Sequence, residues 1–114
     1  MTEESLHRAV AQYLDLALPP GVWWTTIPAG GGGRIRGAKL KACGYKAGTP
    51  DILIVGTGCP AFIELKTVKG RLSPAQKVCH AGLKDAHAWV AVCRSLAEVE
   101  GSLRAWGVPL MVKL

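Results

Sequence analysis

The first part of the chain alternates apolar and polar residues at the spacing of a helix. From Glu3 onward, apolar residues recur at three- and four-residue intervals, which places them along one stripe of a helical surface. Thr2 is suited to cap the amino end, and Pro19-Pro20-Gly21 ends the pattern. The sequence therefore predicts a helix over Glu3–Ala17 whose buried stripe consists of Leu6, Val10, Tyr13, Leu14 and Ala17.

Four short segments are rich in the apolar and β-branched residues that are typical of strands. They span Val22–Ile27, Ile52–Val55, Ala61–Lys66 and Trp89–Cys93. The second of them is apolar throughout, which favours a buried, central strand. The short turn Thr57–Pro60 predicts that the second and third strands form a hairpin. After the first strand, the glycines of residues 30–33 predict a flexible loop.

Two capping signals predict helices in the second half of the chain. Ser73-Pro74-Ala75-Gln76 combines a serine cap, a proline at the first helical position and a glutamine three residues after the cap, so a helix should run to about His87. Ser95-Leu96-Ala97-Glu98 repeats the capping pattern and predicts a helix to about Trp106. A short helix around Ala38–Cys43 and a last short strand over Leu110–Val112 complete the expected elements.

The resulting order is α-β-β-β-α-β with an extra C-terminal helix. The strand, helix and strand between Glu64 and Cys93 form a crossover unit, so we expect an α/β fold with a mixed β-sheet flanked by helices. The chain has 114 residues and is 49% hydrophobic, which is the composition of a globular protein and predicts one domain over residues 1–114.

Positive charge is concentrated in one part of the chain. The net charge is +6 and the pI is about 9.4, yet no acidic residue lies between Asp15 and Asp51. The basic residues of that stretch favour contact with phosphates, although an ordinary solvated basic loop would look the same. The candidate nucleic-acid-binding residues are Arg34, Arg36, Lys39, Lys41 and Lys46.

Several other kinds of protein are disfavoured. No apolar run approaches the roughly 18 residues of a membrane helix, and the acidic start Met1-Thr2-Glu3-Glu4 differs from a secretory signal. The four cysteines form no C-x-x-C pair, which argues against a zinc site. We therefore expect a cytoplasmic protein without a membrane partner.

Two acids and a lysine form a candidate catalytic site. Asp51 precedes the apolar strand Ile52–Val55, and Glu64 and Lys66 lie on one face of the next strand. The hairpin would bring both carboxylates together as an oxygen site suited to Mg²⁺ or Mn²⁺. A lysine beside them could favour hydroxide or hold a phosphate. Each residue alone has an ordinary explanation, as a surface pair or a turn residue, so the combination carries the hypothesis.

Three motifs, in this order, resemble the signature of a known family. They are Gly48-Thr49-Pro50-Asp51, Glu64-Leu65-Lys66 and Leu72-Ser73-Pro74-Ala75-Gln76. Together they resemble the G-x-P-D, E-x-K and L-S-x-x-Q motifs of the VRR-NUC family, a branch of the PD-(D/E)xK nuclease superfamily. The resemblance extends from Glu3 to about Cys93 and is greatest to small stand-alone phage and bacterial members. It implies a restriction-endonuclease-like core.

The resemblance also implies a role for each residue of the central motif. Asp51 and Glu64 would bind the divalent metal, Mg²⁺ or Mn²⁺, together with the backbone carbonyl of Leu65. Lys66 would position or activate the attacking water. The expected catalytic residues are Asp51, Glu64, Lys66 and Gln76, and the expected metal ligands are Glu3, Asp51, Glu64 and Leu65.

Two of these residues have a second explanation in the sequence. Gln76 would support the site, but its presence is explained equally well by a role as the capping partner of Ser73. An acid of the first helix would complete the metal site, and Glu3 falls on the stripe that faces the sheet, whereas Glu4 does not. Compensation of the helix dipole would account for both acids without any site.

The implied activity is hydrolysis of DNA phosphodiester bonds by a metal-dependent endonuclease. A chain of this size has little surface for reading a base sequence. The small single-domain members of the family that it resembles look like junction-resolving or structure-specific nucleases, so the resemblance implies a homodimer that acts on branched DNA such as a Holliday junction. The alternatives are a repair or restriction-type endonuclease that cuts linear duplex and, less favoured, a DNA-binding module without catalysis.

Overall fold

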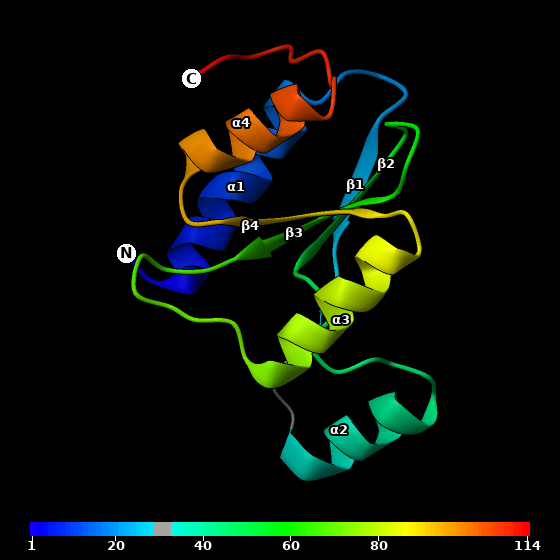
Figure 1. Ribbon diagram of the computed structural model, residues 1–114. Coiled ribbons are helices and arrows are strands. Elements are labelled where there is room, and N and C mark those ends of the chain that lie inside the picture. Colours follow the sequence, from blue (N-terminus) through cyan, green and yellow to red (C-terminus); the bar gives the residue numbers. More distant parts are fainter. Residues whose placement is uncertain (29–32) are drawn as a thin grey trace.

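The computed structural model describes residues 1–28 and 33–114 (Figure 1). Residues 30–32 of the expected glycine-rich loop fall outside the described residues. None of the described helices is long and apolar enough to cross a membrane. The elements, in chain order, are α1 (Glu3–Ala17), β1 (Trp23–Thr26), α2 (Gly33–Ala42), β2 (Ile52–Val55), β3 (Ala61–Leu65), α3 (Pro74–Asp85), β4 (Trp89–Cys93) and α4 (Leu96–Ala105).

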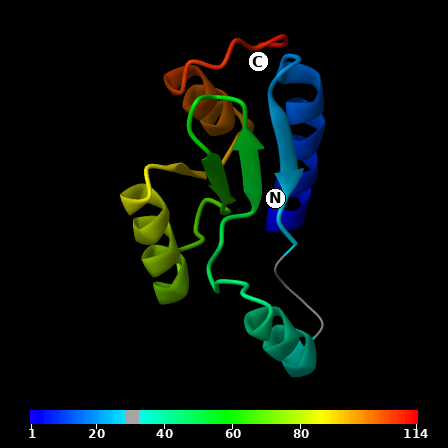
Figure 2. The same cartoon turned by 90° about the vertical axis from the view of Figure 1, so that its right-hand side faces the viewer.

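The strands form one mixed sheet in the order β1-β2-β3-β4. The first three strands are antiparallel, so β2 and β3 make the predicted hairpin, whereas β4 runs parallel to β3 after the α3 crossover. Helices α1 and α4 cover one face of the sheet and α3 covers the other (Figure 2). The expected α/β fold with a mixed sheet flanked by helices is therefore confirmed.

The core lies between α1, α4 and the central strands. The predicted stripe of α1 is buried throughout, and it packs in one cluster with Ile52, Ile54 and Ile63 of the hairpin. The Thr2 hydroxyl accepts a hydrogen bond from the Ser5 amide at 3.0 Å and caps the helix. The helix over Glu3–Ala17 is confirmed because its cap and its apolar period agree.

Helix α2 differs from the prediction. The expected element between β1 and β2 was a short helix around Ala38–Cys43, but α2 covers Gly33–Ala42. It has no buried residue and no apolar stripe, because basic and small residues are spread around its surface. A search for apolar periodicity could therefore not define where this helix begins.

The predicted strand over Leu110–Val112 is wrong. The segment has no strand geometry, and the Met111 amide donates to the carbonyl of Ala17 at 2.7 Å. Its hydrogen bond therefore goes to the end of α1 and not to an edge of the sheet. Pro109 lacks the amide that a continuous ladder would need just before this segment.

The second predicted capping box is confirmed at Ser95 and wrong at Glu98. Ser95 caps α4 by accepting from the Glu98 amide at 3.1 Å. The Glu98 carboxylate, however, accepts from the Arg94 amide at 3.0 Å and not from the amide of Ser95. The cap therefore reaches one residue further back and joins the end of β4 to the start of α4.

The loop before β2 is seated directly against the amino end of α3. Gly48 has φ +83°, a conformation that favours glycine. A Cβ at this position would lie 2.4 Å from the carbonyl carbon and oxygen of Ala75 and 2.6 Å from the amide nitrogen of Gln76. The loop can approach α3 this closely because Gly48 has no side chain, and Asp51 follows three residues later.

Replacing Gly48 with alanine should destabilise the protein. We expect a loss of at least about 1–3 kcal/mol in the free energy of unfolding, because both the backbone strain and the clash with α3 oppose folding. Gly101→Ala is the matched control, since a Cβ added to this helical glycine would have nothing within 4 Å and should stabilise the helix by up to about 1 kcal/mol. Urea denaturation measures both, and equal stability of the two variants would contradict the close approach.

Candidate active site

Three polar or charged side chains are buried together in the described part of the chain. Glu64, Lys66 and His80 expose only 2%, 9% and 5% of their surface. Glu64 lies in β3, Lys66 directly follows it, and His80 projects from α3. Burying such groups costs free energy unless they have partners, and clusters of this kind are typical of functional sites.

Asp51 joins this cluster through the register of the hairpin. Ile52 pairs with Ile63, so continuing the antiparallel register by one residue sets Asp51 opposite Glu64. The Asp51 carboxylate accepts a hydrogen bond from the Leu65 amide at 2.7 Å. The predicted convergence of Asp51, Glu64 and Lys66 at one end of the central strands is therefore present.

Helix α3 holds both oxygens of the Glu64 carboxyl group. The Gln76 amide nitrogen donates to Glu64 Oε2 at 3.3 Å, and His80 Nε2 lies 3.1 Å from Glu64 Oε1. Gln76 also accepts from the Ser73 amide at 2.9 Å and so completes the cap of α3. The two explanations for Gln76 are thus compatible, because its side-chain oxygen caps α3 while its side-chain nitrogen contacts Glu64.

No motif in the sequence points to His80, although its spacing from Gln76 indicates that the two lie together. Gln76 and His80 are four residues apart, so on a helix they lie on the same face, one turn apart. The pKa of His80 is lowered, first by burial and then by the charges of Lys84 and Lys66. His80 is therefore neutral at pH 7, and its contact with Glu64 is a hydrogen bond and not an ion pair.

The surroundings of Glu64 disfavour the ionised form of its carboxyl group. The pKa of Glu64 is raised to about 8, first by burial and then by the adjacent Asp51 carboxylate. The charge of Lys66 opposes this rise, and Glu3 adds a small further contribution to it. A proton on Glu64 removes the charge of this carboxyl group, and a divalent cation between the two carboxylates would compensate it.

Glu3 lies near the cluster but is not part of it. A cleft of about 320 Å³ is lined by Glu3, Glu4, Asp51 and Leu65, among others, and both helix acids are exposed at its mouth. Within residues 1–28 and 33–114, no three acidic, histidine or cysteine side chains converge closely enough to hold a metal by themselves. The structure brings together Asp51 and Glu64, while Glu3 stays a candidate ligand.

The turn after Lys66 is held by Arg94, a residue to which no motif in the sequence points. One nitrogen of the Arg94 guanidinium group donates to the carbonyls of Thr67 and Gly70 at 2.6 Å each, and to that of Val68 at 3.3 Å. The Lys66 amide also donates to the carbonyl of Cys93 at 3.1 Å. The end of β4 therefore fixes the backbone on which Lys66 stands.

The predicted nucleic-acid-binding residues lie apart from this cluster. Arg34, Arg36, Lys39 and Lys41 are exposed on α2, and Lys46 is exposed on the loop that follows it. Helix α2 lies beyond the end of α3, away from α1 and α4 (Figure 1). These residues form an extended basic surface and do not line the cleft at Asp51.

The chain thus combines a mixed sheet flanked by helices with a cluster of two acids and a lysine at the end of its central hairpin. No protein-family model matches the chain, and no curated protein sequence matches it. A solved structure of a VRR_NUC domain protein superposes with a TM-score of 0.68 and 21% sequence identity, over 93% of this chain and 88% of that chain. At this identity the likeness shows the fold alone, and the expected mixed sheet with flanking helices matches that of the VRR_NUC domain protein.

The raised pKa of Glu64 predicts a pH-dependent stability in the metal-free protein. Between the ordinary value of 4.5 and about 8, folded Glu64 keeps a proton that the unfolded chain has lost. Stability should therefore fall as the pH rises through this window, by at most about 1.4 kcal/mol per pH unit, and level off above it.

The measurement is urea denaturation between pH 7 and 8.5 in the presence of a chelator. Glu64→Gln should remove the decline, because a glutamine has no proton to lose. Asp85→Asn, at an exposed position on α3, should keep the decline of the unmodified protein. Equal slopes in the unmodified protein and Glu64→Gln would show that Glu64 does not titrate in this window.

Proposed function

We propose that this protein is a divalent-metal-dependent DNA endonuclease that hydrolyses phosphodiester bonds. The observation that carries the proposal is the burial of Glu64, Lys66 and His80 together, with Asp51 at the same strand ends. A hydrophobic set of the same size would stabilise the fold better, so a functional reason for this polar cluster is favoured. The similarity in fold to a VRR_NUC domain protein supports the same conclusion.

The donor set suits a hard divalent cation such as Mg²⁺ or Mn²⁺. Asp51 and Glu64 would hold it through carboxylate oxygens, joined by the backbone carbonyl of Leu65, and Glu3 would complete the site from the mouth of the cleft. When bound, the cation would polarise the scissile phosphate and lower the pKa of water. Loss of the proton from Glu64 would accompany binding, since a ligating carboxylate is ionised.

Lys66 is suited to bind the scissile phosphate and to position the attacking water. Its stem is buried, and its charge acts on both Glu64 and His80, so it stands inside the cluster. The Arg94 contacts to the following turn hold its backbone in place. A lysine fixed in this way would stabilise the negative charge that develops on the phosphate and align the water for attack.

For the substrate, we propose branched DNA of the Holliday-junction type, cut by a homodimer. The exposed basic surface of α2 would contact phosphates without reading bases, which suits recognition of shape. Cleavage of linear duplex in repair or restriction is the alternative. Light scattering together with cleavage of a junction and a linear duplex of equal length separates the two.

Removing any of the three central side chains should abolish cleavage. We expect Asp51→Ala, Glu64→Ala and Lys66→Ala to lose about 10²- to 10⁴-fold in activity with Mg²⁺ or Mn²⁺, because each acts on the reacting phosphate, water or metal. The measurement is cleavage of labelled linear and branched DNA. Asp85→Ala and Lys113→Ala, both at exposed positions outside the motifs, should keep full activity.

The outcome of this comparison decides between catalysis and binding alone. Full activity in all three variants would refute the proposed site. Metal-independent DNA binding without cleavage by the unmodified protein would favour a non-catalytic DNA-binding module. Circular dichroism on each variant confirms that a loss of activity does not come from unfolding.

His80 should support metal binding without touching the metal. Because it contacts one oxygen of Glu64, His80→Leu should weaken Mn²⁺ binding about 10- to 100-fold, and His80→Gln should weaken it less. Isothermal titration calorimetry measures this without any DNA. His87→Asn is the control, since His87 is exposed on the turn after α3. Unchanged Mn²⁺ affinity in His80→Leu would leave His80 a role in packing only.

A further inference from the structure

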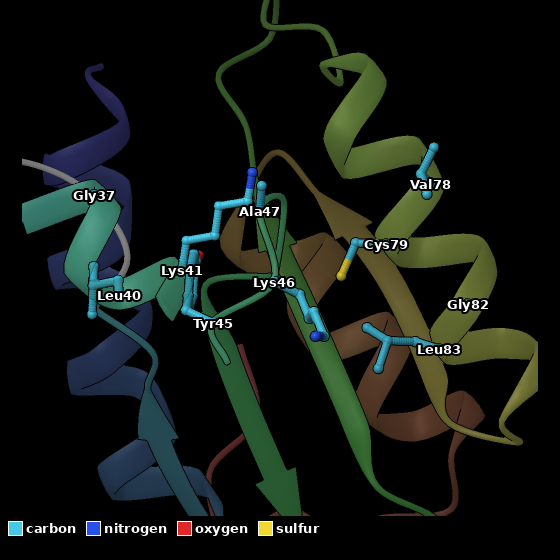
Figure 3. A pocket seen from close by; sticks show the side chains of 10 residues that line it. All are labelled: Gly37, Leu40, Lys41, Tyr45, Lys46, Ala47, Val78, Cys79, Gly82 and Leu83. Atoms are coloured by element: carbon cyan, nitrogen blue, oxygen red, sulfur yellow. The ribbon is translucent and has the colours of Figure 1, made fainter. Parts of the chain in front are cut away.

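A second concave surface lies between α2 with its following loop and α3 (Figure 3). This groove has a volume of about 790 Å³, which is within the usual size range of ligand sites. Leu40 and Tyr45 line one wall, and Val78, Cys79 and Leu83 line the other. Its lining is mainly apolar, so a phosphate backbone alone would leave most of it uncovered.

The groove and the catalytic cluster share helix α3. Gln76 and His80 face Glu64, whereas Cys79 and Leu83 project into the groove (Figure 3). The Cys79 thiol also lies 3.9 Å from the hydroxyl of Thr49, two residues before Asp51. The α3 wall of the groove is therefore in contact with the loop that leads to Asp51.

The charge around the groove favours a polyanion over a second copy of this chain as the occupant. Residues 33–46 contain five basic residues and no acidic residue, and Lys41 and Lys46 lie at the groove itself. A second copy of the chain docked here by twofold symmetry would bring two such basic surfaces together, which is unfavourable. A polyanion that also offers apolar surface meets both requirements.

We infer that this groove binds an unpaired segment of a DNA strand, with bases against Tyr45 and the apolar wall of α3 and phosphates at Lys41 and Lys46. Unpaired bases expose flat apolar faces that stack on aromatic side chains, whereas a duplex hides them. The inference rests on the proposed function and adds one feature to its branched substrate, an unpaired segment of DNA strand next to the branch.

The test is binding of fluorescent DNA in a chelator, measured by anisotropy. We expect a single-stranded oligonucleotide and a forked duplex to bind more tightly than a blunt duplex of equal length. Tyr45→Ala should weaken binding of the single strand about 5- to 150-fold, and Tyr45→Phe should keep it, because the aromatic face makes the contact. Trp23→Ala is the matched control, an aromatic residue that is 60% exposed on the edge strand β1.

A second variant keeps the test independent of Tyr45. Val78 is 74% exposed on the α3 wall, so Val78→Asp should fold normally and weaken binding of the single strand through its charge. Equal binding of single strand and blunt duplex, or unchanged binding in both groove variants, would overturn the inference. So would a fall in molecular mass in solution when either residue is changed, because the groove would then hold a second copy.

Failure of this inference and failure of the proposed function give different results. The binding experiment contains no metal and needs no cleavage. If the unmodified protein cuts DNA and the groove variants bind single strands normally, only the groove assignment is wrong. If the unmodified protein never cuts DNA with Mg²⁺ or Mn²⁺ but loses single-strand binding in Tyr45→Ala, the groove assignment holds and the nuclease proposal is wrong.

Discussion

The burial of the Glu64 carboxyl group on the central strand β3 is the constraint on which the rest of the structure depends, because a buried carboxyl group is costly unless its neighbours form hydrogen bonds with it. Both of its oxygens contact side chains of α3. Burial and the second acid opposite it, Asp51, raise its pKa, and the charge of Lys66 opposes that rise. Burying two adjacent acids in this way is costly as structure and makes the cluster suitable as a cation site. The hairpin, α3 and the turn after Lys66 together surround this carboxyl group.

Helix α3 is the element through which these requirements are linked. Its amino end receives the glycine loop that leads to Asp51, because Gly48 has no side chain to collide with it. Its first turn supplies Gln76, which caps the helix and contacts Glu64 at once. Its outer side forms a wall of the apolar groove. A small shift of this helix would therefore disturb stability, the carboxylates and the groove together.

Acidic and basic chemistry are kept apart in space. The carboxylates lie at the end of the central strands, while the basic residues lie on α2 and its loop, where no side chain of α2 is buried. This separation suits a protein that holds a cation at one place and a polyanion over a wider surface. The groove between α2 and α3 has Lys41 and Lys46 at its lining, and α3 borders both this groove and the carboxylates.

The sequence by itself determined most of the elements and the motif residues, because capping patterns, the apolar stripe of α1 and strand alternation are local properties. It therefore placed α1, β2 and β4 correctly and selected Asp51, Glu64 and Lys66. It could not define α2, which has no apolar period, or reveal His80 and Arg94, whose contacts join segments far apart in the chain. Only the tertiary structure decided that Glu64 is buried, that Gln76 has two contacts and that a groove exists, since these depend on packing between elements.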